Sequence, residues 1–134
     1  MLGYFDDIET GQVVQLGALP LSESTVRSFC KDFAPDWDAS RGVPEAMLYA
    51  VWSRLEEEAS RQWPQTKRLA VDALRWMRSP PVGELVRARL TVMGKDPVGD
   101  GKGIVISQHD LLDESGRLLF SCLTRCVFAR SVNA

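Results

Sequence analysis

One short stretch of the chain, KDFAPDWDAS, brings several side chains that can do chemistry close together. Its carboxylates are Asp32, Asp36 and Asp38, which flank Pro35 and Trp37. A carboxylate beside a substrate carbonyl acts as a general base or as a nucleophile. Trp37 offers an indole N–H, which donates a hydrogen bond but takes up no proton near neutral pH. The opposing interpretation is that Asp36 and Asp38 are solvated turn residues.

Further candidates lie outside this stretch. Pro44 is expected in the first turn of a helix, whose free N–H groups can face a developing oxyanion. The carboxylate of Glu45 favours the helix dipole but opposes such a negative charge. The only histidine, His109, falls on the strand face shared by Val105 and Leu111. We interpret it as a packed or surface strand residue rather than as an acid–base group of a functional site.

Two predicted helices position the aspartate stretch. The first begins after the N-cap Ser22, following a strand over 12–19 that ends at Pro20. The second is about 20 residues long and begins near Pro44. It turns polar only from Glu56 onward. Its apolar stripe consists of Met47, Leu48, Val51, Trp52, Leu55 and Ala59.

The second half of the chain is predicted to form an antiparallel sheet. Apolar or alternating segments fall near 69–77, 84–94, 103–112 and 117–129. The stretches between them, SPPVGE, KDPVGDGKG and DESG, are rich in turn residues. Short turns between consecutive strands indicate antiparallel pairing, and a single long apolar helix indicates a sheet curled around it. We therefore predict one α+β domain spanning residues 1–134.

Composition excludes several classes of partner. The chain has 16 Lys and Arg against 18 Asp and Glu, a formal charge of −2, and its basic residues are dispersed. We therefore expect no nucleic-acid partner. The sequence contains neither a long apolar run nor a basic and apolar leader pattern, so we expect a cytoplasmic protein without a membrane partner. Cys30, Cys122 and Cys126 are expected to be reduced core thiols.

The order of these segments resembles the MaoC-like family of (R)-specific enoyl-thioester hydratases and dehydratases, which have the hotdog fold. The resemblance rests on the opening YFDDIETGQ, the capped helix with its aspartate loop, the central helix near a proline, and LRWMRSPPVGELVRARLTV. It implies a single hotdog domain, in which a curved antiparallel sheet wraps one long central helix.

The catalytic loop of that family has the form Asp-x-Asn-Pro-x-His, in which Asp and His hold the reacting water. This chain matches the pattern at Asp32 and Pro35 but carries Ala34 and Trp37 where Asn and His are expected. The family's His-Gly step at the start of the helix is also missing, because Pro44 is followed directly by glutamate and alanine. The resemblance therefore implies acyl-thioester binding or processing, with hydratase activity weak or lost.

By the same resemblance Asp32 is the candidate catalytic residue. The candidate substrate-binding residues are Pro35, Asp36, Trp37, Asp38, Pro44, Glu45, Met47 and Trp76. The tryptophans are candidates for an acyl tunnel, although Trp52 and Trp76 are more simply read as core or interface packing. Arg75 and Arg78 are candidates for binding a phosphate of the substrate, although exposed arginines usually contact only water. We expect no metal and no cofactor, because coenzyme A or phosphopantetheine is part of the substrate.

Three assemblies or activities stay open at this point. The resemblance implies a homodimer, since family members pair their sheets and build the site across the junction. It also allows a non-catalytic subunit that completes an intact hotdog partner in a heteromeric dehydratase. The third alternative is an acyl-CoA thioesterase that uses a loop carboxylate, for which Asp32, Asp36, Asp38 and Glu45 are the candidates.

Overall fold

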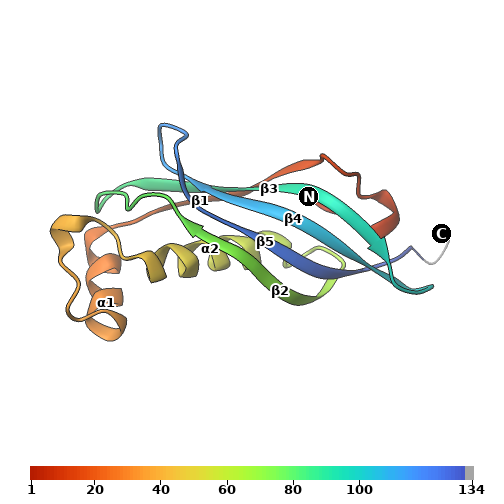
Figure 1. The fold of residues 1–134 in the computed structure, drawn as a ribbon, viewed down its shortest axis with the longest axis horizontal. Helices are drawn as coiled ribbons and strands as arrows, with labels where there is room; N and C mark the ends of the chain where they lie inside the picture. Colours follow the sequence, from red (N-terminus) through yellow and green to blue (C-terminus); the bar gives the residue numbers. More distant parts are fainter. Residues whose placement is uncertain (132–134) are drawn as a thin grey trace.

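The computed structural model describes residues 1–131 and contains one open antiparallel sheet with two α-helices (Figure 1). The strands are β1 (Val13–Pro20), β2 (Gln65–Trp76), β3 (Leu85–Pro97), β4 (Lys102–Leu112) and β5 (Leu118–Ala129). They lie in the order β1-β3-β4-β5-β2. Helix α2 (Glu45–Ser60) runs along one face of the sheet, and α1 (Glu23–Phe33) lies beyond one end of it. The predicted α+β architecture is confirmed.

Local signals set where the helices begin. Ser22 is the N-cap of α1, and its hydroxyl accepts a hydrogen bond from the N–H of Thr25 at 3.3 Å. Pro44 is the N-cap of α2 and not, as predicted, a residue of its first turn. Its ψ of 146° is extended, which is the usual backbone of an N-cap residue, and the preceding residue Val43 donates its N–H to Pro80 O.

The predicted ends of α2 and of two strands were also wrong. Helix α2 has 16 residues, and it ends before Pro64, which disfavours helical backbone at the residue preceding it. Strand β2 therefore begins at Gln65, earlier than the predicted 69–77, and β3 extends to Pro97, beyond the predicted 84–94. Within residues 1–131 neither helix is both long and apolar enough to cross a membrane.

Helix α2 and the facing side of the sheet form the core. The strand residues that alternate toward α2 include Val86, Ala88, Leu90 and Val92, as the period-two pattern predicts. Trp52 on α2 is fully buried, and its ring lies 5.0 Å from that of His109 on β4. The apolar faces predicted for α2 and β3 are therefore part of the observed core, although Ala59 is only partly buried.

Glu56 departs from its expected place on the polar side of α2. Its residue is only 3% exposed, whereas the following residues Glu57 and Glu58 are exposed. The carboxylate accepts hydrogen bonds from Gln65 Nε2 at 3.2 Å and from Arg68 Nη1 at 3.3 Å, both on β2. Glu56 lies one turn after Trp52, so the helix points it at the edge of the sheet, where these donors satisfy it.

The three cysteines are free thiols. Cys122 and Cys126 are buried on the core face of β5, which confirms their predicted place. Burial raises the pKa of Cys122 to about 12 and that of Cys126 to about 11, so both remain thiols at neutral pH. Cys30 on α1 is only half-buried.

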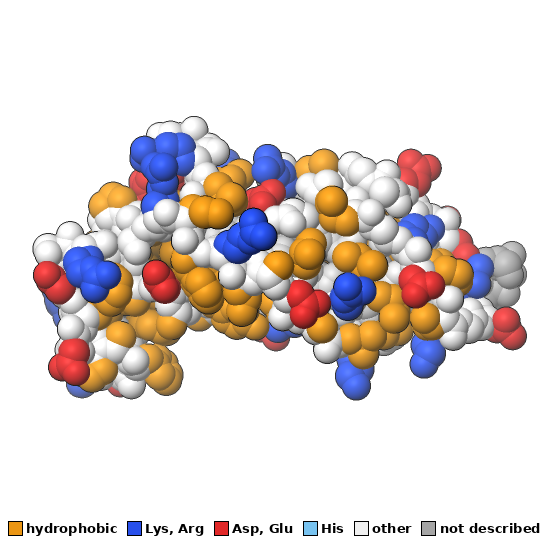
Figure 2. Space-filling model, viewed as in Figure 1, with side chains coloured by type: hydrophobic (Ala, Val, Ile, Leu, Met, Phe, Trp, Pro, Cys, Tyr) orange, Lys and Arg blue, Asp and Glu red, His pale blue; other side chains and the backbone are white. Residues whose placement is uncertain are grey.

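The charged side chains of the surface show no single-sign patch on the face in view. Figure 2 shows Lys and Arg side chains spread among Asp, Glu and hydrophobic side chains. Several are paired across strands, such as Arg89 with Asp110 at 2.8 Å and Arg125 with Asp72 at 3.4 Å. On this face, therefore, no large basic surface is present among the described residues.

Gly103 gives a test of the packing at the end of the sheet. A Cβ added to Gly103 would lie 2.4 Å from two ring carbons of Phe5, whose ring is buried. We expect Gly103→Ala to lower the free energy of unfolding by about 2 kcal/mol because the ring must move out of a packed site. Chemical denaturation measures the change. Gly101→Ala meets no atom within 4 Å and is the matched control; equal effects in both variants would contradict the packing argument.

Candidate functional site

The aspartate stretch forms the loop between α1 and α2. Helix α1 ends at Phe33, and a short 3₁₀ helix, η2 (Ala39–Arg41), precedes Gly42. Asp38 is the N-cap of η2, and its Oδ1 accepts from the N–H of Ser40 at 3.0 Å and from its hydroxyl at 2.8 Å. The backbone hydrogen bond from Ser40 is the main reason that the pKa of Asp38 lies below its usual value. The carboxylate of Asp38 thus stabilises the turn, which agrees with its interpretation as a turn residue.

Trp37 is fixed across the loop. Its Nε1–H donates to Gly42 O at 2.8 Å, and the guanidinium of Arg41 lies 4.5 Å from the centre of its ring system. The indole also forms part of the wall of a cavity of about 270 Å³, whose apolar lining includes Val26, Cys30 and Val82. The position expected for an imidazole therefore holds a bulky ring whose only polar group already has a partner.

Gly42 holds this loop against the segment between β2 and β3. Its φ is +92°, a conformation that residues with a side chain rarely adopt. A Cβ at this position would lie 2.5 Å from Pro80 O, and the next residue, Val43, donates its N–H to the same oxygen at 2.9 Å. The loop and the start of α2 are therefore placed by one close backbone contact.

The start of α2 meets the end of β2. Pro44 and Met47 are buried, and Pro44 O accepts from the N–H groups of Met47 at 3.1 Å and of Leu48 at 3.3 Å. Trp76 Nε1–H donates to Glu45 O at 2.8 Å, and its ring packs 5.4 Å from that of Phe120. Trp76 is 36% exposed, so it covers the core without being enclosed by it. The fold brings together Glu45 and Trp76, which are far apart in the sequence.

The remaining candidate residues lie on the surface. Asp32 in the last turn of α1 and Asp36 in the loop are exposed, and within residues 1–131 neither carboxylate has a hydrogen-bond or ion-pair partner. Pro35 is exposed beside them, as are Arg75 and Arg78 beyond the loop. These residues stay predicted site residues. The segment 34–44 beside them contains no histidine.

His109 lies in the core instead. It is 1% exposed, its Nε2 forms a 2.9 Å hydrogen bond with Thr124 Oγ1, and its Nδ1 has no partner among residues 1–131. Burial lowers its pKa to about 3, so the ring is neutral at physiological pH. The interpretation of His109 as a packed strand residue is confirmed.

One functional candidate is missing from the sequence-based set. Glu56 and Arg68 form a largely buried ion pair at the edge of the sheet, far along α2 from its start. The signal was the spacing of Leu48, Trp52 and Glu56, which places all three on one helix face. Among residues 1–131 no group of three or more His, Cys, Asp or Glu side chains has a geometry that could hold a metal ion.

The comparisons with known proteins address the fold. Neither a protein-family model nor a curated protein matches the chain. The structure of the MaoC-like dehydratase from Rhodospirillum rubrum is 17% identical, covers 96% of this chain and 97% of its own, and superposes with a TM-score of 0.84. A conserved hypothetical protein from Mycobacterium tuberculosis with a double hotdog fold is 20% identical, with coverages of 98% and 45% and a TM-score of 0.77.

A third similar structure is a complex of two kinds of subunit. It is HadBC from Mycobacterium tuberculosis, a (3R)-hydroxyacyl-ACP dehydratase, which is 12% identical with coverages of 88% and 96% and a TM-score of 0.61. At these sequence identities the similarity establishes the fold only, and any activity must be argued from the side chains of the site. The chain therefore has the hotdog fold, the fold of MaoC-like dehydratases, as the sequence resemblance predicted.

Proposed function

We propose that this chain is a MaoC-like protein that binds an acyl thioester of coenzyme A or of an acyl carrier, and that its hydratase activity is weak or lost. The observation that carries the proposal is the place of Trp37. Its Nε1–H is bonded to Gly42 O, so the loop that would hold the reacting water is closed by an indole. An indole N–H cannot accept and return a proton near neutral pH.

The other half of the acid–base pair is also incomplete. Asp32 is exposed and has no partner among residues 1–131 that would fix its orientation. His109, whose Nδ1 has no partner among the described residues, lies in the core with a pKa of about 3 and is a poor base at neutral pH. Binding is supported by the apolar cavity beside Trp37 and by the aromatic surface at Trp76, which suit an acyl group.

We further propose that the protein works as a dimer through β2. This strand ends the sheet, so one edge of its 12-residue backbone is unpaired within residues 1–131. Leu69, Leu74 and Met77 are exposed along or just beyond it. A long free edge with apolar side chains readily pairs with another strand, and a second copy satisfies it by two-fold symmetry.

A non-catalytic subunit of a heteromeric dehydratase is the second candidate. It is favoured by the structural similarity to HadBC, together with the free β2 edge and the degenerate loop. In this case the partner would supply the Asp and His, while this chain would contribute the wall of the acyl site. Co-expression with a hotdog protein carrying an intact Asp-x-Asn-Pro-x-His loop would then give a stable complex more active than that protein alone.

Hydration of crotonyl-CoA, followed by the loss of enoyl absorbance, tests the main proposal. We expect the purified protein to show little or no turnover, together with a thermal shift on binding acyl-CoA. Turnover of crotonyl-CoA at ordinary hydratase rates would contradict the proposal. Release of free thiol from saturated acyl-CoAs would favour the thioesterase alternative.

Restoring the family's residues should restore part of the chemistry. We expect Ala34→Asn combined with Trp37→His to raise crotonyl-CoA hydration by about 10² over the parent protein, because imidazole supplies the missing proton transfer. Ala34→Asn with Trp37→Phe is the control, since it removes the same hydrogen bond to Gly42 without adding a base. Equal rates in two folded variants would show that Trp37 does not occupy a catalytic position.

A further inference from the structure

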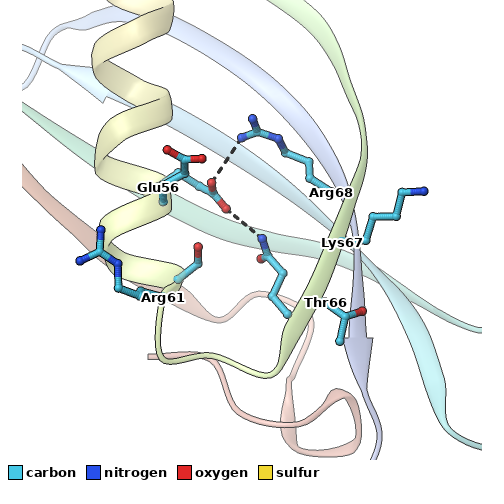
Figure 3. Close-up of a pocket in the computed structure, with 8 residues that line it drawn as sticks. Glu56, Arg61, Thr66, Lys67 and Arg68 are labelled. Carbon is cyan, nitrogen blue, oxygen red and sulfur yellow. Dashed lines mark hydrogen bonds and ion pairs between the residues drawn. The ribbon is translucent and has the colours of Figure 1, made fainter.

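A cleft opens between the C-terminal half of α2 and the first residues of β2 (Figure 3). Its volume is about 480 Å³, and polar or charged side chains line it throughout. It lies toward the opposite end of α2 from Trp37 and Glu45, so it is separate from the loop discussed above. The residues that matter for its chemistry are Glu56, Glu57, Arg61, Lys67 and Arg68.

Glu56 forms the floor of the cleft. Its side chain is 4% exposed, and its two carboxylate oxygens accept hydrogen bonds from Gln65 and Arg68 (Figure 3). A buried carboxylate is tolerated when such partners satisfy it. Because these bonds use both oxygens, the charge of Glu56 is compensated inside the protein, and the residue holds Arg68 in place.

Arg68 is held at the boundary between the core and the cleft. One N–H reaches Glu56 at 3.3 Å, and the guanidinium lies 5.3 Å from the centre of the Trp52 ring system. Its side chain is still 26% exposed. A guanidinium has five N–H donors in a rigid fork and matches the oxygens of a phosphate, so holding it in place lowers the entropic cost of binding one.

The other charged side chains make the cleft weakly cationic. Arg61 and Lys67 form no ion pair within residues 1–131, and Figure 3 shows them on opposite sides of the cleft, both directed away from Glu56. Three cations therefore stand against the two carboxylates of Glu56 and Glu57. Glu56 and Arg68 offset each other, so Arg61 and Lys67 remain against Glu57, and the cleft carries one net positive charge.

We propose that this cleft binds a phosphate group carried by a small molecule, with Arg68 as the direct ligand, Glu56 as the positioning residue, and Arg61 and Lys67 attracting the anion. The phosphates of a coenzyme A or phosphopantetheine handle are one source, and that choice rests on the proposed function. Free phosphate is the other source. Pairing of β2 with a second strand would use its backbone edge and leave the Arg68 side chain, which points toward α2, in place (Figure 3).

Titration calorimetry of the full chain tests the site with three probes: coenzyme A, inorganic phosphate and pantetheine, which lacks phosphate. We expect coenzyme A to bind and pantetheine to bind at least about tenfold more weakly. Inorganic phosphate that competes with coenzyme A would support the same site. Binding of phosphate alone would support a phosphate site for free anions. No binding of either phosphate compound at about 10 mM would overturn the proposal.

Variants separate the site from general surface charge. The double variant Arg68→Met, Glu56→Leu replaces the ion pair by apolar side chains. It leaves no buried charge unpaired, and it removes the guanidinium that would bind the phosphate. We expect it to weaken coenzyme A binding at least about tenfold. Arg87→Met, on the exposed outer face of β3, is the control and should leave binding unchanged. Equal affinities in the parent and the double variant would contradict a role for Arg68.

The positioning role of Glu56 has its own test. Glu56→Gln keeps an oxygen that can accept from Arg68, so its affinity for coenzyme A should stay within about threefold of the parent. Glu56→Leu releases Arg68 and should weaken binding more than Glu56→Gln does. The opposite order would show that Glu56 does not orient the arginine. None of these probes carries an acyl group, so this inference and the proposed thioester function fail independently.

Discussion

Gly42→Ala is expected to lower the free energy of unfolding by about 3 kcal/mol. Two costs add at this residue. The backbone is in the positive-φ region, at +92°, and the new Cβ would lie 2.5 Å from the carbonyl oxygen of Pro80. That oxygen is backbone and already accepts from Val43, so it cannot move aside without breaking the hydrogen bond that places the start of α2. Urea unfolding followed by circular dichroism measures the change.

Gly116→Ala is the matched control for the backbone cost. Gly116 also has a positive φ, +85°, but an added Cβ would meet no atom within 4 Å. We expect it to cost about 1 kcal/mol, the strain of the backbone alone. The excess in Gly42→Ala then measures the contact with Pro80. Equal losses in the two variants would show that the loop shifts freely and that Trp37 is not held by it.

Lowering the pH from 7 to 5 is expected to destabilise the protein by about 2 kcal/mol through His109 alone. The ordinary pKa of histidine is 6.5, and burial lowers it in the folded protein to about 3. The unfolded chain therefore takes up a proton below pH 6.5 while the folded chain does not. The stabilisation is fully present above pH 6.5 and is lost progressively as the pH falls toward 3. Each pH unit within this window costs about 1.4 kcal/mol.

His109→Gln removes this pH dependence while keeping an amide that can bond Thr124. We expect the variant to show a flatter dependence of stability on pH between 7 and 5, whatever its stability at pH 7. Asp6, Asp38 and Asp113 also have lowered pKa values in the folded protein. Their contribution to stability is lost only as the pH falls below about 3.8, which is outside the range from pH 7 to 5. An unchanged slope in His109→Gln would mean that the ring is reached by solvent or takes up its proton in the fold.

Local patterns accounted for the architecture. Val86, Ala88, Leu90 and Val92 alternate with Arg87, Arg89 and Thr91. This alternation specified which side of β3 meets α2, because side chains on a strand point to opposite faces in turn. The cap at Ser22 specified where α1 begins, since its hydroxyl bonds a neighbouring backbone N–H. Such signals act over a few residues and can be read without knowing what lies across the fold.

The sequence also established one negative point about chemistry. Residues 34–44 contain no histidine, so the segment that closes the loop cannot supply an imidazole from its own side chains. This holds for any packing of the loop. The departure of this loop from the pattern Asp-x-Asn-Pro-x-His is thus a matter of residue types, and the structure adds that Trp37 Nε1–H donates to Gly42 O.

Only the tertiary structure determined which distant side chains meet. Glu56 is buried because the start of β2 brings Gln65 and Arg68 to it, and Trp76 reaches Glu45 because β2 ends beside the start of α2. The low pKa of His109 likewise comes from the elements packed around it. These contacts join segments brought together by the pairing of β2 with β5, and no local pattern encodes that pairing. Periodicity determined the faces of each element, whereas chain topology determined what each face touches.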